Sequence, residues 1–347
     1  MAIATDELLA ARRPLGATGL HVAPVALGTM QFGWTVTDVD AMRVLDVYAD
    51  AGGNLVDTAN MYGGDQSLES FAANRAHVGV SEDVIGRWLA ARGARGAVVL
   101  TTKVRARMWD GPDGEGLTRG HIVRAVEDSL RRLRTDHVDV LYAHWPDPAA
   151  DPGEWLETFG DLIRAGKVRH AGTSNFCDFA GFGDQLSDLL ARSDADPRLA
   201  RIACEQPRYS LLNRREYEAR LQPIALREQL GIVTYSSLAS GFLAGRFRSG
   251  VAGSARQSFA ARYMTAAGLE VLDTVEAIAR EHNAPVAAVS LAWILAQPGV
   301  SAAIVGPDTP GELLQCAHGA HVELSDGELR RLDGVAWLAS DPEFVNW

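Results

Sequence analysis

The chain has 347 residues, of which 47% are hydrophobic and 22% charged, so it holds enough apolar material for a sizeable core and is unlike a disordered protein. Its 44 acidic residues outnumber 33 basic ones and give a formal charge of -11, which disfavours nucleic acid and anionic membranes as partners. The three cysteines, Cys177, Cys204 and Cys316, are widely spaced and form no CxxC pair, which indicates free thiols.

The N-terminal segment, MAIATDELLAARRPLG, has no basic stretch followed by an apolar core, so it does not resemble a secretory signal. No part of the sequence reaches about 18 uninterrupted apolar residues, the length that a membrane-spanning helix needs. We therefore expect a cytoplasmic protein without a membrane span.

The predicted elements alternate between short apolar strands and longer segments with helical periodicity. Residues 12–24 come first, and their Gly-rich centre between strand-like residues predicts a β-hairpin. Eight strands are predicted, of which the first overlaps the end of this hairpin. In chain order they cover residues 22–29, 54–59, 97–104, 138–144, 168–174, 201–207, 231–237 and 301–306.

Amphipathic segments separate these strands. Residues 39–52 and 120–136 carry apolar side chains at helical spacing, and Asp38 is predicted to begin the first of these helices. Ser81 is expected to precede another helix, which ends before Gly93. The pattern is that of parallel strands joined by crossover helices.

Eight such units without an intervening linker predict an α/β fold, a (β/α)8 TIM barrel that forms a single domain over residues 1–347. Residues 239–301 hold a loop and two helices where one would suffice, so extra helices are expected near the C-terminus. An open doubly wound sheet is the alternative, but the turn after the first strand, LGTMQFG, lacks the GxGxxG pattern.

Polar residues stand at the carboxyl ends of these strands, where a barrel builds its active site. They are Asp57, Lys103, His144, Ser174, Asn175, Gln206 and Tyr235. Any one of them alone is more simply explained as a structural group. Their repetition at the same end of successive strands indicates a functional site.

The motifs that contain these residues resemble those of the aldo-keto reductase family, in particular its bacterial branch. Seven of them follow the family's order and spacing over nearly the whole chain: LGATGLHVAPVALGTMQFG (15–33), NLVDTANMYGG (54–64), VVLTTKV (98–104), DHVDVLYAHWPDP (136–148), IRAGKVRHAGTSNF (163–176), EQPRYSLLNR (205–214) and IVTYSSLASGFLAGRF (232–247).

The resemblance implies reduction of a carbonyl by a nicotinamide cofactor, with Tyr62 as the proton donor. A phenol with an ordinary pKa of about 10 is a poor match for this task near neutral pH. Lys103 is therefore expected to lower the pKa of Tyr62, and Asp57 to pair with the lysine. His144 would share the substrate oxygen, as a neutral donor or as a proton relay.

Cofactor contacts follow from the same resemblance. Ser174, Asn175 and Gln206 look like the residues that bind the carboxamide, and Tyr235 like the aromatic side chain that stacks on the nicotinamide. The residues that resemble the pyrophosphate loop are Ser236, Leu238, Ser240, Gly241 and Arg246.

The adenosine end departs from the family's pattern. The segment GPDTPGELLQC supplies the expected contacts Gly306, Asp308, Glu312, Gln315 and Cys316. Its two carboxylates would repel a 2′-phosphate and could accept hydrogen bonds from a free ribose hydroxyl. The family resemblance still favours NADP(H) slightly over NAD(H), since Arg246 or Arg256 could compensate for the carboxylates.

The expected substrate is an aldehyde, a ketone or a sugar-like carbonyl that is reduced to the alcohol. Met30, Trp34, Trp109 and Trp145 follow strand ends and either line the substrate pocket or pack beneath loops. The tail, residues 321–347, resembles the family's variable segment beside the substrate site.

The sequence leaves two alternative functions. The family includes potassium-channel β subunits, so a catalytically weak, cofactor-sensing binding subunit is the alternative to an enzyme. A metal-dependent barrel hydrolase would need His and carboxylate ligands at several strand ends, and only His144 and Asp57 are available, so no metal site is expected. No sequence pattern specifies the oligomeric state.

Overall fold

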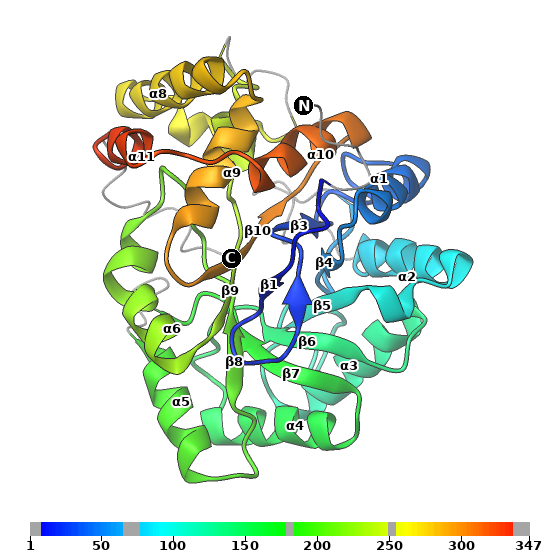
Figure 1. The fold of residues 1–347 in the computed structure, drawn as a ribbon. Helices are drawn as coiled ribbons and strands as arrows, with labels where there is room; N and C mark the ends of the chain where they lie inside the picture. Colours follow the sequence, from blue (N-terminus) through cyan, green and yellow to red (C-terminus); the bar gives the residue numbers. More distant parts are fainter. Residues whose placement is uncertain (1–7, 65–76, 178–183, 249–254, 336–347) are drawn as a thin grey trace.

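Eight parallel strands close into a barrel inside a ring of helices in the computed structural model (Figure 1). The structure describes residues 8–64, 77–177, 184–248 and 255–335. The barrel order is β10-β3-β4-β5-β6-β7-β8-β9, which confirms the predicted (β/α)8 fold. The strands are β3 (Val25–Gly28), β4 (Leu55–Asp57), β5 (Val99–Val104), β6 (Val138–Ala143), β7 (Val168–Thr173), β8 (Ile202–Glu205), β9 (Gly231–Thr234) and β10 (Val300–Val305).

Along the chain, helices lie between the barrel strands and after the last one. They are α1 (Asp38–Asp50), α2 (Val80–Arg92), α3 (Arg119–Leu133), α4 (Pro152–Arg164), α5 (Gln185–Ala195), α6 (Gln222–Glu228), α7 (Gln257–Ala260), α8 (Ala266–His282), α9 (Val286–Ala296), α10 (Pro310–Ala317) and α11 (Asp326–Asp333). Helices α8 and α9 both lie between β9 and β10, so the extra helices are present. Of the predicted tail, residues 336–347 lie outside the described part of the chain.

The predicted hairpin is present and covers the amino-terminal end of the barrel. Strands β1 (Arg13–Pro14) and β2 (His21–Val22) pair antiparallel. Between them, Leu15 is fully buried with the residues that fill the barrel interior. Gly16 has a φ of 54°, and a Cβ there would lie 2.3 Å from the backbone nitrogen of Gly231, so this turn requires glycine.

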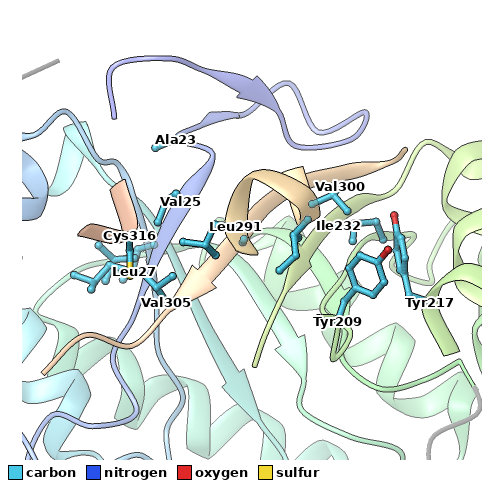
Figure 2. Packing of buried hydrophobic residues seen from close by; sticks show 14 of the residues in the cluster. Ala23, Val25, Leu27, Tyr209, Tyr217, Ile232, Leu291, Val300, Val305 and Cys316 are labelled. Atoms are coloured by element: carbon cyan, nitrogen blue, oxygen red, sulfur yellow. The ribbon is translucent and has the colours of Figure 1, made fainter. Parts of the chain in front are cut away.

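Side chains alternate along the strands between the barrel interior and a layer beneath the helices. On β3, Ala26 belongs to the inner cluster, whereas Val25 and Leu27 belong to the outer one. Figure 2 shows Val25 and Leu27 in that outer layer, together with Leu291 of α9. Two packed apolar layers therefore hold the strands in register.

The same alternation orients the residues at the carboxyl ends of β4, β5 and β6. Leu55, Val99 and Val140 point into the barrel. Asp57 and Lys103 are two and four residues further along their strands, and His144 directly follows β6, four residues beyond Val140, so they share this orientation. The strands thereby bring three residues that are far apart in the sequence to one end of the barrel.

One predicted helix start is wrong. Helix α1 begins at Asp38 as expected, with the Thr37 hydroxyl accepting a hydrogen bond from the backbone N–H of Asp40. Ser81, in contrast, lies inside α2, because the left-handed Gly79 precedes that helix. The buried hydroxyl of Ser81 instead lies 2.8 Å from the Thr29 hydroxyl and 3.0 Å from that of Thr58. It ties α2 to the loops that follow β3 and β4.

Across the described ranges, no helix is long and apolar enough to cross a membrane. The same residues contain no group of three or more His, Cys, Asp or Glu side chains that could hold a metal ion. All three cysteines are free thiols, as predicted, and all are buried.

Candidate active site

A cavity of about 450 Å³ lies at the carboxyl end of the barrel strands. It brings together most of the residues predicted from the sequence. Those on its wall are Met30, Trp34, Asp57, Tyr62, His144, Trp145, Ser174, Asn175, Gln206, Tyr235, Ser236, Leu238, Ser240, Gly241, Arg246, Gly306, Glu312, Gln315 and Cys316. Lys103, Asp308 and Trp109 do not line it.

A buried ion pair lies beneath this cavity. Lys103 is 1% exposed, and its Nζ is 2.6 Å from Asp57 Oδ2 and 2.8 Å from the carbonyl oxygen of Thr58. The other oxygen of Asp57 accepts hydrogen bonds from the Thr101 hydroxyl and from the amide of Gln206. Burial lowers the pKa of Lys103, while the carboxylate of Asp57 opposes that shift. Hydrogen bonds with Thr58, Thr101 and Gln206 thus hold the pair in place.

Tyr62 lies between this pair and the cavity. Its hydroxyl is 3.5 Å from Lys103 Nζ, and the same ammonium lies 5.1 Å from the centre of its ring. Burial nevertheless raises the pKa of Tyr62 well above its ordinary value, and the charge of Asp57 raises it further. The expected lowering of this pKa is therefore wrong, because burial disfavours the phenolate and the charge of Asp57 disfavours it further. Tyr62 is a neutral phenol at neutral pH.

His144 faces Tyr62 across the cavity, with ring centres 5.9 Å apart in an edge-on arrangement. Burial lowers the pKa of His144 well below its ordinary value, and Lys103 and Arg105 add to this shift. The imidazole is therefore neutral at neutral pH. Its Nδ1 is buried without a hydrogen-bond partner in the described structure, so the edge that lines the cavity is the Nε2 edge.

The amide side chains form a connected group at the end of the neighbouring strands. Asn175 donates through Nδ2 to the Ser174 hydroxyl at 3.0 Å, and its Oδ1 accepts from the Tyr235 hydroxyl at 2.9 Å. The Ser174 hydroxyl donates to the carbonyl oxygen of Gln206 at 2.7 Å. Since Gln206 also reaches Asp57, this group is linked directly to the ion pair.

The loop after β9 has an unusual backbone. Ser236, Ala239 and Ser240 have φ values of 52°, 48° and 58°, although none is a glycine, and Gly241 has a φ of 94°. Such left-handed residues cost free energy and concentrate at ligand-binding loops. All but Ala239 of these four line the cavity.

Ion pairs connect this loop region to the loop after β10. Arg246 Nη1 lies 3.2 Å from Asp308 and 3.0 Å from Glu312. Arg256 Nη2 lies 2.6 Å from the other oxygen of Asp308 and donates to the carbonyl oxygen of Gly306. Asp308 is thus held between two arginines, and both arginines line the cavity.

The aromatic candidates divide into two groups. Trp34 and Trp145 line the cavity, and Trp34 contacts Phe259 of α7 with ring centres 6.5 Å apart. Trp109 instead packs against His121, and the guanidinium of Arg124 lies 4.0 Å from the centre of its ring. The second interpretation, packing beneath a loop, therefore applies to Trp109.

Several residues at this site were not predicted from the sequence. Thr101 binds Asp57, Phe259 closes part of the wall, and Gln31 donates to the carbonyl oxygen of Pro307 at 3.0 Å. Gln31 and Thr101 follow or belong to strands already identified, so their position alone could have drawn attention to them. Phe259 belongs to α7, a four-residue helix that is too short to give a periodic signal.

These features define a barrel protein whose cavity joins a phenol, a buried lysine–carboxylate pair, an imidazole and a row of amide side chains. The chain belongs to the aldo/keto reductase family, whose model matches residues 24–336. It is accordingly an oxidoreductase of that family, whose members generally use NAD(P)H.

Individual relatives agree with this assignment. The chain is 35% identical to "Uncharacterized oxidoreductase YrpG" of Bacillus subtilis (strain 168), over 92% of this chain and 94% of that protein. It is 31% identical to "Protein tas" of Escherichia coli (strain K12), over 94% and 97%. It is also 30% identical to "Probable voltage-gated potassium channel subunit beta" of Arabidopsis thaliana, over 84% and 85%.

Proposed function

We propose that this protein is an NAD(P)H-dependent reductase that converts an aldehyde, a ketone or a sugar-like carbonyl to the alcohol, with Tyr62 as the proton donor. The observation that carries the proposal is the chain of contacts from Asp57 through Lys103 to Tyr62 at the cavity wall. A proton donor and a fixed positive charge beside it are what a carbonyl oxygen needs as it gains negative charge.

The residues present fit a nicotinamide dinucleotide. Ser174, Asn175 and Gln206 offer the donors and acceptors that a carboxamide requires, and all three line the cavity. Gly241 is left-handed, so the backbone can approach a ligand closely there. When bound, the reduced nicotinamide supplies the hydride.

The protein's own groups handle the proton and the developing charge. Tyr62 would give its phenolic proton to the carbonyl oxygen, and Lys103 would stabilise the phenolate that remains. The neutral His144 would donate a second hydrogen bond to the same oxygen through Nε2, as the neutral-donor alternative requires. Asp57 keeps Lys103 in place rather than touching the substrate.

For the cofactor, we propose that NADH is used at least as well as NADPH. The slight preference for NADP(H) inferred from the sequence depended on Arg246 or Arg256 being available for a 2′-phosphate. Both arginines already contact Asp308, and Arg246 also contacts Glu312. The positive charges of these two arginines are balanced by the negative charges of the two carboxylates. A 2′-phosphate would therefore have to displace the carboxylate of Asp308.

A catalytically weak, cofactor-sensing binding subunit is the second candidate. The similarity to a protein named as a probable potassium-channel β subunit supports it. It predicts nucleotide binding without carbonyl turnover, which separates it from a reductase.

The deciding experiment is to measure the oxidation of NADH and NADPH with a panel of aldehydes, ketones and sugars, alongside nucleotide binding by fluorescence. Turnover that depends on the carbonyl supports the reductase. Tight nucleotide binding with no turnover on any carbonyl would favour the binding subunit instead.

The pH profiles of the two directions should differ. Because the pKa of Tyr62 is raised and that of His144 is lowered, neither group titrates near neutral pH. With saturating cofactor, kcat/KM for carbonyl reduction should stay flat between about pH 6 and about pH 8. Alcohol oxidation needs the phenolate, whose fraction rises about tenfold per pH unit below the pKa, so its rate should rise with pH. A reduction profile with a midpoint near pH 7 would contradict these assignments.

Trp145 and Trp109 offer a matched test of the cavity. Trp145→Ala removes a wall beside His144, whose ring centre is 4.7 Å away, and should raise KM for a bulky aldehyde by about tenfold. Trp109→Ala, outside the cavity, should leave that KM within about twofold. Steady-state kinetics on both variants checks the assignment, and equal effects would argue against it.

A further inference from the structure

A buried carboxylate that the proposed mechanism leaves unused lies behind the cavity wall. Glu205 is the last residue of β8 and is 0% exposed. Cys204 belongs to the barrel interior and Gln206 lines the cavity. Because side chains alternate along a strand, Glu205 points to the opposite face, behind the residues that face the ligand.

The carboxylate of Glu205 accepts hydrogen bonds from both sides of the Ser174–Asn175 pair. The hydroxyl of Thr173 donates to Oε2, and the backbone N–H of Phe176 donates to Oε1 at 3.2 Å. The backbone N–H of Asn175 also interacts with this carboxylate. Glu205 therefore closes the turn that follows β7 from its buried side.

That turn needs an external acceptor. Asn175 has a φ of 67°, a left-handed conformation that is unfavourable for a non-glycine residue. Its side chain is engaged with Ser174, Tyr235 and the carbonyl oxygen of His144. The buried N–H groups of the turn thus depend on Glu205 for partners, and buried N–H groups without partners are costly.

We propose that Glu205 is a positioning residue for cofactor binding: its carboxylate fixes the turn formed by residues 174–176, which presents Ser174 and Asn175 to the carboxamide. The inference rests on the proposed function, because it assumes that a nicotinamide dinucleotide occupies the cavity. It adds a residue that does not itself touch the cofactor.

The ionisation of Glu205 also makes the hydrogen bonding of this turn depend on pH. Burial raises the pKa of Glu205 to about 7, against the hydrogen bonds from Thr173 and the two N–H groups. The titratable groups that sense its charge are Tyr142 on β6, Cys204 on β8 and Tyr235, which directly follows β9. Burial raises the pKa of each of them, so they stay neutral.

The direction in which pH changes nucleotide affinity follows from the hydrogen-bond donors that face Glu205. Above the pKa the ionised carboxylate accepts from all its donors, and below it one oxygen carries a proton and loses acceptor capacity. Nucleotide affinity should therefore rise as pH increases through about 7.

The test is a fluorescence titration of NADH on the full-length protein at about pH 6 and about pH 8; NADH is chosen because it lacks the titrating 2′-phosphate. The wild-type Kd should fall about three- to tenfold as pH rises. Glu205→Gln should bind about three- to tenfold more weakly than the wild type at the higher pH and show little pH dependence.

Thr173 supplies an independent pair of variants. Thr173→Val removes the hydroxyl donor and should weaken NADH binding. Thr173→Ser keeps the donor and should bind NADH about as well as the wild type. Thermal unfolding identifies any variant that does not fold, and the Thr173 pair then decides the question without Glu205→Gln.

Two results would overturn the inference: a Glu205→Gln protein that keeps the wild-type pH dependence, or a Thr173→Val protein that binds NADH like Thr173→Ser. A wild-type protein that binds neither NADH nor NADPH would instead refute the proposed function, and this inference with it. The two failures are therefore distinguishable.

Discussion

Tyr62→Phe is expected to lower kcat for carbonyl reduction by about 10²- to 10⁴-fold, while nucleotide Kd stays within about twofold of the wild type. The substitution removes one oxygen and leaves the ring in place. Lys103 cannot replace the phenol as donor, because its side chain is 1% exposed and its Nζ already donates hydrogen bonds to Asp57 and Thr58. His144 is neutral and buried on its Nδ1 edge, so it has no second proton to supply.

Tyr142→Phe is the matched control for this prediction. It makes the same chemical change at a fully buried tyrosine of β6 that lies in the barrel interior and does not line the cavity. Its kcat should remain close to that of the wild type. The assignment of Tyr62 would be wrong if both variants lost activity equally, or if Tyr62→Phe retained full activity. Single-turnover kinetics with saturating cofactor separates the chemical step from product release.

Asp308→Asn is expected to shift cofactor preference toward NADPH by about ten- to a hundredfold, measured as the change in the ratio of the NADH and NADPH Kd values. The substitution keeps the size of the side chain and removes its charge. Arg256 would then no longer face the charge of Asp308, whereas Arg246 would still pair with Glu312 at 3.0 Å. A 2′-phosphate could accept from Arg256, and one charge-assisted hydrogen bond contributes about 1.5–3 kcal/mol. NADH affinity should change little, since the amide oxygen of asparagine can still accept a hydrogen bond from a free ribose hydroxyl.

Thr35→Val is the control for Asp308→Asn, because it removes a hydrogen bond to the Asp308 carboxylate without removing the charge. The Thr35 hydroxyl donates to Asp308 at 2.7 Å, but its removal leaves the charge of Asp308 in place. The nucleotide ratio should therefore stay near that of the wild type. High salt should reduce the NADPH gain of Asp308→Asn, because these groups are partly exposed and screened. An unchanged ratio would mean that the arginines do not reach the 2′ position.

Much of the fold was readable from the sequence, because strands and helices impose different periodicities on a chain. Each barrel strand overlaps its predicted range, and the hairpin over residues 12–24 is present. The errors are local. Ser81 resembles a helix cap in sequence, yet the left-handed Gly79 starts the turn and Ser81 is buried against Thr29 and Thr58.

The candidate site was partly readable for the same reason. Asp57, Lys103 and His144 lie at strand ends on one side of each strand, so an ordered set of motifs suffices to bring them together. Trp109 could not be placed in this way. Its neighbours His121 and Arg124 come from the following helix, and a tryptophan in a loop carries no periodic information about which side it faces.

The sequence by itself determined the barrel through the periodicity of its strands and helices, and the family and most of the predicted cavity residues through the order of its motifs. The tertiary structure decided the properties that depend on burial and on contacts between distant segments. It showed that the pKa of Tyr62 is raised rather than lowered and that His144 is neutral. It also paired Asp308 with two arginines and placed Glu205 behind the turn at Asn175. Electrostatic free energies depend on distance and solvent exposure, and a linear sequence specifies neither.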